Sequence, residues 1–280
     1  MIDAKIICDS INPAGNRLTT VQCTFPRWIL AEVNTHRMLS RNSASSRAIP
    51  INKIISQVFS TPAQPVSWGA NRSGMQSKNN LSGIRLFLAK RLFLFARYPA
   101  ILFAFLLSKV GLHKQVTNRI LEPWIWHTAI LSATEWDNFF KLRLHPAAQP
   151  EFQELAKRIK STMDSNIPVA LNWGEWHLPY SDYNVIAPDN DTRRTVSVAR
   201  CARVSYVRQN EIRSIESDSK FTNMLSTNGH WSPFEHVAVA ENTDLNTGNF
   251  RGWKQYRKFF NGESGAENIN NKKMDDFYNE

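Results

Sequence analysis

The N-terminal residues alternate apolar and polar side chains in the way that is typical of β-strands. AKIICDS (4–10) and RLTTVQCTF (17–25) contain several β-branched residues, and NPAGN (12–16) between them is rich in turn formers. We predict a strand, a turn and a second strand. In WILAEVNTHRMLS (28–40), apolar residues recur at roughly helical spacing, so a helix is expected there, followed by the polar, turn-like RNSASSRAIP (41–50).

The centre of the chain changes from loop to helical patterns. Residues 60–83 contain most of the loop-forming residues and no periodic apolar pattern, which predicts a long loop or flap. Helices are then expected at about 84–121, 129–142 and 149–163. Beyond them, 192–207 is basic and rich in β-branched residues, 221–229 predicts a helix, 235–242 predicts a strand, and the polar tail after Glu263 is expected to be loosely ordered.

The Leu- and Phe-rich segment 84–110 raises the question of a membrane span. Lys90, Arg91 and Arg97 interrupt it, and the apolar run that follows Pro99 is well short of the ~20 residues that a spanning helix needs. Two amphipathic helices around Pro99 are therefore predicted, and a membrane is not an expected partner.

Composition indicates a globular protein with an anionic partner. The 280 residues are 42% hydrophobic, and 34 Lys and Arg outnumber 24 Asp and Glu to give a formal net charge of +10. This charge favours nucleic acid, an acidic membrane surface or phosphorylated small molecules. Three cysteines without a CxxC pair indicate neither a disulfide framework nor a zinc site, and the start of the chain lacks the pattern of a signal peptide. We expect a cytoplasmic protein.

One short segment resembles the signature of a known enzyme family. THRMLSRNSASSRAIP (35–50) is similar to RHRxxSxNExSxR, the signature of flavin-dependent thymidylate synthases. The matching residues are His36, Arg37, Ser40, Asn42, Ser45 and Arg47.

Three further parts of the chain resemble the same family. LLSKVGLHKQVTNRILEP (106–123) resembles its helix-turn-helix, with Arg119 before a Leu and a Pro. TEWDNFFKLRLHPAAQPEFQELA (134–156) resembles the stretch that carries Asn138, Arg143 and Gln149. ARVSY (202–206) and GHWSPFEH (229–236) resemble two more motifs, which in the family usually precede the signature, so the motif order here is permuted. WKQYRKFFNGES, from Trp253, is either a degenerate second signature or, as we prefer, a basic surface helix.

The resemblance implies a fold, an assembly and a set of site residues. It implies an α/β (α+β) fold with a mixed sheet and a helical layer, in a single domain over 1–280 with an insertion at about 60–108 and a loose tail at about 264–280. It also implies a homotetramer. FAD would be contacted by His36, Arg37 and Asn42 of one chain and by Asn138, Ser205, His230, Ser232 and Glu235 of neighbouring chains, and the nucleotide by Ser45, Arg47, Arg119 and Arg143.

The reaction implied by the resemblance is one-carbon transfer to C5 of a pyrimidine nucleotide. Methylenetetrahydrofolate would donate the carbon, NADPH would reduce FAD, and dUMP would become dTMP. Arg143 is the catalytic candidate, because a guanidinium beside the pyrimidine carbonyl stabilises negative charge that develops on the ring. No cysteine lies in these motifs, which agrees with a route without a thiol nucleophile, and no metal-binding motif is present.

Departures from the family pattern leave the substrate and product open. Thr35 and Ser43 replace an Arg and a Glu of the signature, and Glu32 stands where the family commonly has Gln, near the expected pyrimidine pocket. A carboxylate accepts from the amine of cytosine, so dCMP is an alternative substrate, and hydroxymethylation is an alternative outcome. A non-catalytic nucleic-acid-binding protein is a further alternative, supported by the net charge and the basic segments 193–203 and 251–258.

Overall fold

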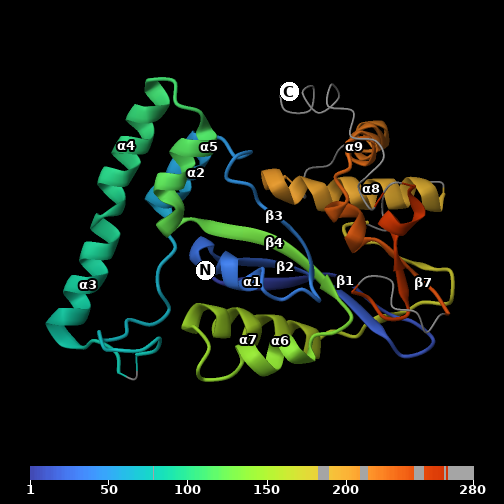
Figure 1. The fold of residues 1–280 in the computed structure, drawn as a ribbon, viewed down its shortest axis with the longest axis horizontal. Coiled ribbons are helices and arrows are strands. Elements are labelled where there is room, and N and C mark those ends of the chain that lie inside the picture. Colours follow the sequence, from blue (N-terminus) through green and yellow to red (C-terminus); the bar gives the residue numbers. More distant parts are fainter. Residues whose placement is uncertain (78, 182–188, 209–213, 243–248, 262, 264–280) are drawn as a thin grey trace.

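The structure, a computed structural model, combines a central mixed sheet with helices on both faces and a long helical arm at one side (Figure 1). It describes residues 1–77, 79–181, 189–208, 214–242, 249–261 and 263. A tail after Glu263 was expected to be loose, but it lies outside the described residues.

The five-stranded sheet has the order β3-β4-β2-β1-β5, in which β1 and β5 are parallel and the other neighbours antiparallel. It confirms the expected mixed α/β fold and the N-terminal hairpin. The side-chain oxygen of Asn12 accepts from the backbone N–H groups of Ala14 and Asn16, which fixes the turn between the first two strands. The strands are β1 (Asp3–Ile11), β2 (Arg17–Pro26), β3 (Ser40–Ser43), β4 (Trp126–Ala133) and β5 (Val169–Ala170).

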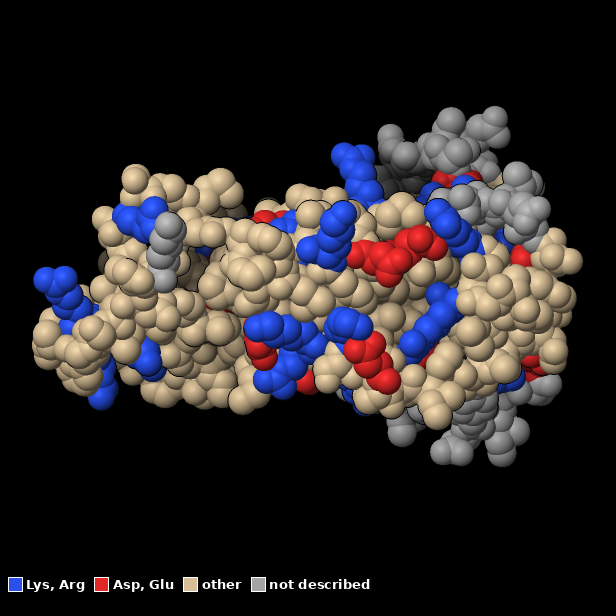
Figure 2. Space-filling model, turned by 90° about the horizontal axis from the view of Figure 1, so that it is seen from below, with Lys and Arg blue, Asp and Glu red and all other residues tan. Residues whose placement is uncertain are grey.

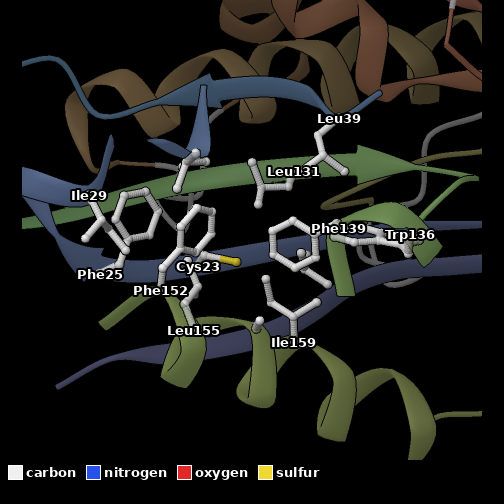
Figure 3. Close-up of a cluster of buried hydrophobic side chains, with 14 of the residues drawn as sticks. Cys23, Phe25, Ile29, Leu39, Leu131, Trp136, Phe139, Phe152, Leu155 and Ile159 are labelled. Atoms are coloured by element: carbon white, nitrogen blue, oxygen red, sulfur yellow. The ribbon is translucent and has the colours of Figure 1, made fainter. Parts of the chain in front are cut away.

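The largest core lies between this sheet and two helices, α6 (Asp137–Arg143) and α7 (Pro150–Asp164) (Figure 3). Phe152, Leu155 and Ile159 lie on one face of α7 at helical spacing, and all three are buried. The helix expected at 149–163 is confirmed. Burying such side chains stabilises the fold by about 1.5–3 kcal/mol each.

A second layer packs on the opposite face of the sheet. It contains a small antiparallel sheet of order β6-β7-β8 and the helices α8 and α9, which are joined by a buried ion pair between Arg203 and Asp218. The basic, β-branched segment 192–207 is thus mainly helix. The helix expected at 221–229 and the strand expected at 235–242 are confirmed. The elements are β6 (Trp176–His177), α8 (Asn190–Arg203), η3 (Val204–Tyr206), α9 (Ile215–Thr227), η4 (Ser232–His236), β7 (Ala238–Ala240), β8 (Trp253–Gln255) and η5 (Tyr256–Phe259).

The helical arm is the long straight feature at the left of Figure 1. Only Ala96 separates its two helices, and the backbone of Ala96 stays in the right-handed helical region, so neither Ala96 nor Pro99, which lies in the first turn of α4, breaks the arm. The expectation of amphipathic helices is wrong, because apolar side chains also cover the outer face. Within the described residues, 83–109 is one helix long and apolar enough to cross a membrane. The arm comprises α3 (Gly83–Phe95) and α4 (Arg97–Lys109), and beside it lie α2 (Ile51–Ser60), α5 (Lys114–Thr117) and η2 (Asn118–Trp124).

Two predicted helices are wrong in part. The helix expected at 28–40 is limited to η1 (Arg27–Ile29) and α1 (Leu30–Val33), because Ser40–Ser43 pairs with β4 and holds this part of the chain extended. The helix expected at 129–142 is a strand as far as Ala133, since β4 pairs on both sides in the sheet. The loop expected at 60–83 is confirmed.

Candidate functional site

The predicted site residues fall mainly into two separate clefts that share no lining residue. The first, which we call the Arg143 cleft, has a volume of about 1300 Å³. The second, the Ser205 cleft, has a volume of about 430 Å³.

The Arg143 cleft lies between the loop that follows α2 and the segments beside α1 and α7. Its walls include Ser67, Met75 and Gln76 of the loop, which the sequence indicated as a flap, and Glu32 and Gln149 on the opposite side. The side-chain amide of Gln76 donates to the carbonyl of Ala147, so the loop is tied across to the segment before α7.

Arg143 is anchored at the end of α6 by a set of directed contacts. Its Nε donates to Nε2 of His36 (2.7 Å), and Nη2 donates to Oγ1 of Thr35 (3.4 Å). The guanidinium also lies over the ring of Phe152, with Cζ 4.3 Å from the centroid. These contacts orient the planar group while 20% of the side chain stays exposed.

His36 supports Arg143 from within the core instead of facing the Ser205 cleft. Its ring meets Phe139 and Phe152 edge-on, and it is buried. Burial, with the positive charges of Arg143 and Arg41, lowers the pKa of His36 to about 4. The imidazole is therefore neutral at pH 7, and its Nε2 accepts the hydrogen bond from the guanidinium.

Glu32 stands beside Arg143 at the mouth of this arrangement. Its carboxylate Oε2 lies 4.0 Å from Nη1 of Arg143, and 41% of the side chain is exposed. That separation exceeds hydrogen-bond length, so the two groups attract each other without closing a direct bond. Both line the cleft, where they present an acceptor next to a donor.

A second charged group lies along the same cleft. Glu122 pairs with Arg119 (2.6 Å) and, more loosely, with Arg27 (3.6 Å). Arg27 and Glu122 line the cleft, whereas Arg119 reaches it through Glu122. Arg27 also contacts Nδ1 of His127, and burial lowers the pKa of the Arg27 guanidinium.

The Ser205 cleft brings together residues from the two ends of the chain. Asn42, Ser45 and Arg47 come from the signature-like segment, and they meet residues of the two C-terminal motifs. The cleft contains six of the predicted site residues, namely Asn42, Ser45, Arg47, Ser205, His230 and Ser232.

Hydrogen bonds across the Ser205 cleft hold these segments in register. The backbone N–H of Ser45 donates to the carbonyl of Ser205 (2.9 Å), and the amide of Asn42 donates to the carbonyl of Cys201 (2.7 Å). Ser232 donates to Oδ1 of Asn42 (3.4 Å). Burial lowers the pKa of His230. The motifs that are distant in the sequence therefore form one surface.

Five predicted site residues line neither cleft. His36 and Arg119 reach the Arg143 cleft only through Arg143 and Glu122. Arg37 and Asn138 are exposed. Glu235 forms an ion pair with Arg257, which belongs to the segment 253–264 that we interpreted as a basic surface helix. Of that segment, the described residues form the short strand β8 and the 3₁₀ turn η5.

The chemistry of the Ser205 cleft fits part of a dinucleotide. Arg47 and Lys114 provide positive charge for phosphate, and the serine and asparagine side chains provide hydrogen-bonding groups. A volume of about 430 Å³ lies low in the ~300–1,000 Å³ range of ligand pockets. One chain thus offers a polar, cationic subsite rather than a complete enclosure. Among the described residues, no group of three or more His, Cys, Asp or Glu could hold a metal ion.

Sequence reasoning missed several residues that line the clefts. His113 and Lys114 line the Ser205 cleft, and Arg27 and Gln76 line the Arg143 cleft. His113 and Lys114 lie inside a quoted motif, so their polarity was a usable signal. Arg27 and Gln76 carry no such signal, because only the fold brings them beside Arg143.

No protein-family model and no curated protein sequence matches the chain. Solved structures are similar to part of it. The UMP/dUMP methylase PolB from Streptomyces cacaoi bound with 5-Br dUMP has 12% identity and a TM-score of 0.46, covering 58% of this chain and 90% of that one. The same enzyme with 5-Br UMP has 13% identity and a TM-score of 0.44, covering 58% and 88%. Thymidylate synthase X (ThyX) from Helicobacter pylori with FAD and dUMP has 16% identity and a TM-score of 0.36, covering 52% and 67%.

Proposed function

We propose that the protein is an FAD-dependent enzyme that transfers a one-carbon unit from methylenetetrahydrofolate to C5 of a pyrimidine deoxynucleotide. The conversion of dUMP to dTMP is the reaction that the motif resemblance implies, and hydroxymethylation is the alternative outcome. When bound, FAD reduced by NADPH supplies the hydride. The protein's own part is to bind the nucleotide, to orient its ring and to stabilise charge at the ring carbonyl through Arg143.

The observation that carries this proposal is the Ser205 cleft. Asn42, Ser45 and Arg47 meet Ser205, His230 and Ser232 there, although the two groups lie far apart in the chain. Motifs that are separate in the sequence thus line one polar cleft. This supports the interpretation that they belong to one binding site. The isolated motifs would not have justified that step.

The division of nucleotide residues between two clefts supports an oligomer. The resemblance assigns Ser45, Arg47 and Arg143 to one nucleotide, yet in a single chain Arg143 lines a different cleft from the other two. We infer that a second copy completes the site, with the Arg143 cleft of one chain facing the Ser205 cleft of another. The expected homotetramer would provide such a pairing.

Flavin retention and product mass test the proposal. The purified protein should carry or take up FAD and, with NADPH, methylenetetrahydrofolate and dUMP or dCMP, should add a one-carbon unit to the nucleotide. Ser205→Tyr should lower flavin occupancy at least several-fold by filling the cleft, whereas Ser161→Tyr on the exposed face of α7 should not. A protein that neither binds flavin nor changes either nucleotide would overturn the proposal.

A further inference from the structure

The Arg143 cleft contains a donor and an acceptor side by side. Nη1 of Arg143 and Oε2 of Glu32 are 4.0 Å apart and both face the cleft. Within the described part of the chain, the carboxylate of Glu32 accepts no hydrogen bond, and Arg143 is its only ion-pair partner. The pair is therefore able to bind a third group that has its own donor and acceptor.

Arg143 has donors left for such a group. His36 takes Nε–H and Thr35 takes one N–H of Nη2, which leaves the N–H groups of Nη1 and the second one of Nη2. Phe152 below the guanidinium and the neutral His36 beside it hold the plane in place. The cleft thus presents two parallel donors followed by a carboxylate acceptor.

This order of groups complements the edge of cytosine and not that of uracil. Cytosine offers acceptors at O2 and N3 and a donor at its exocyclic amine, and Asp or Glu is the usual acceptor for that amine. Uracil has N–H at position 3 and a carbonyl at position 4. Its N–H would meet a guanidinium N–H, and its carbonyl would meet the carboxylate, leaving both protein groups poorly paired.

We propose that Glu32 and Arg143 together select a cytosine nucleotide, with dCMP as the substrate. This inference rests on the proposed function, since it names the base that the same site accepts. The choice depends on the carboxylate: glutamine at this position would offer an N–H to the carbonyl of uracil and would remove the preference.

Binding measurements with the FAD-loaded protein test this assignment. The dissociation constant for dCMP should be at least about 10-fold lower than that for dUMP, because one correctly read base contact contributes about that much or more. In Glu32→Gln the ratio of the two constants should fall to near one or reverse. Glu154→Gln, which breaks an exposed ion pair on α7, should leave the ratio unchanged.

A ligand-side comparison avoids dependence on how the variant folds. The 2′-deoxyribonucleotide of zebularine keeps the acceptors O2 and N3 but lacks the exocyclic amine of cytosine, so it should bind the unmodified protein several-fold more weakly than dCMP. If Glu32 only positions Arg143, Glu32→Gln weakens both nucleotides equally and the ratio stays constant, which overturns the assignment. Preference for dUMP overturns it too, while leaving the proposed function intact. Failure to bind either nucleotide overturns both.

Discussion

The guanidinium of Arg143 is held in one orientation by its neighbours. A free arginine on a helix end samples many orientations, but here His36, Thr35 and Phe152 fix the guanidinium from three sides. Because the pKa of His36 is lowered to about 4, the imidazole stays an acceptor at neutral pH and does not repel the guanidinium. The group can meet developing negative charge without prior rearrangement.

Replacing Arg143 tests whether this preorganised charge acts on the substrate. Arg143→Lys keeps the charge and loses the planar fork, so single-turnover transfer at saturating nucleotide should fall ~10²–10³-fold, with flavin content unchanged. Arg143→Ala should lose at least as much. Arg158→Lys is the matched control, since Arg158 makes an exposed pair with Glu154 on α7. A normal rate in Arg143→Ala at full flavin occupancy would refute the assigned role.

The residue types of the site were predictable from the sequence, but their partners were not. Motif spacing selected His36 and Arg143 separately and assigned them to different ligands. Their hydrogen bond joins positions 107 residues apart, and it exists because both side chains converge on Phe152 in the core. Spacing along the chain contains no information on such a contact.

Helices and strands were predicted correctly from the sequence where the local hydrophobic pattern agrees with the tertiary contacts of the element. α7 buries one face, so period 3.6 was visible in the sequence, whereas the hairpin was indicated by its β-branched residues and its turn formers, although β2 is buried on both faces. β4 lies between β2 and β3 and is buried along most of its length, so Ala129, Leu131 and Ala133 read as a helix as easily as a strand. The long-range pairing decides the structure there.

A buried polar chain joins the two sheets. Nε2 of His177 on β6 meets Oγ1 of Thr20 (2.8 Å), which meets Oγ of Ser132 (2.6 Å), which meets Nδ1 of His236 (2.8 Å) on η4. Burial lowers the pKa of both histidines to about 3. Both rings are therefore neutral in the folded protein over the working pH range.

Acid should weaken the protein through this connection. An unfolded histidine binds a proton below pH ~6.5, whereas these two stay neutral in the folded state down to about pH 3. The unfolded state then binds more protons, so the free energy of unfolding should fall by about 1.4 kcal/mol per pH unit for each histidine below pH ~6. Urea unfolding between pH 7.5 and 5 measures the slope. His177→Gln should reduce it, and an equal slope in that variant would contradict the explanation.

Charge is unevenly distributed over the whole molecule. From Val33 to Leu121 the sequence contains thirteen Lys and Arg and no Asp or Glu. The molecular end made by the loop after α2 and by α3 accordingly shows Lys and Arg among its charged residues (Figure 2). Of these thirteen residues, Arg47 and Lys114 line the Ser205 cleft, where an anionic ligand is proposed to bind.

The exposed face of the arm leads us to expect a contact between copies there, in addition to the one proposed between the Arg143 and Ser205 clefts. Its exposed positions 84, 88, 91, 95, 98, 102, 105 and 109 alternate steps of four and three residues, as in a helix that packs along a seam. Most are apolar; Ile84 is 68% and Phe95 66% exposed. An antiparallel second copy centred near Ala96 would place Phe95 against Tyr98 and Arg91 against Leu102. Aromatic rings would then meet, and like charges would stay apart.

Substitutions on this seam should therefore separate the copies without unfolding the chain. The unmodified protein should be an oligomer in sedimentation velocity. Phe95→Glu with Phe105→Glu should give monomers, because in the same register the two carboxylates would be buried against Tyr98 and Leu88 of the second copy. Ile167→Glu, which changes an exposed apolar residue outside the arm, should leave the oligomer intact. If the monomers lose turnover while each chain keeps its thermal unfolding transition, the site needs residues from two chains. A monomeric parent that instead floats with anionic vesicles would show that the arm binds a membrane surface and would overturn the contact between copies.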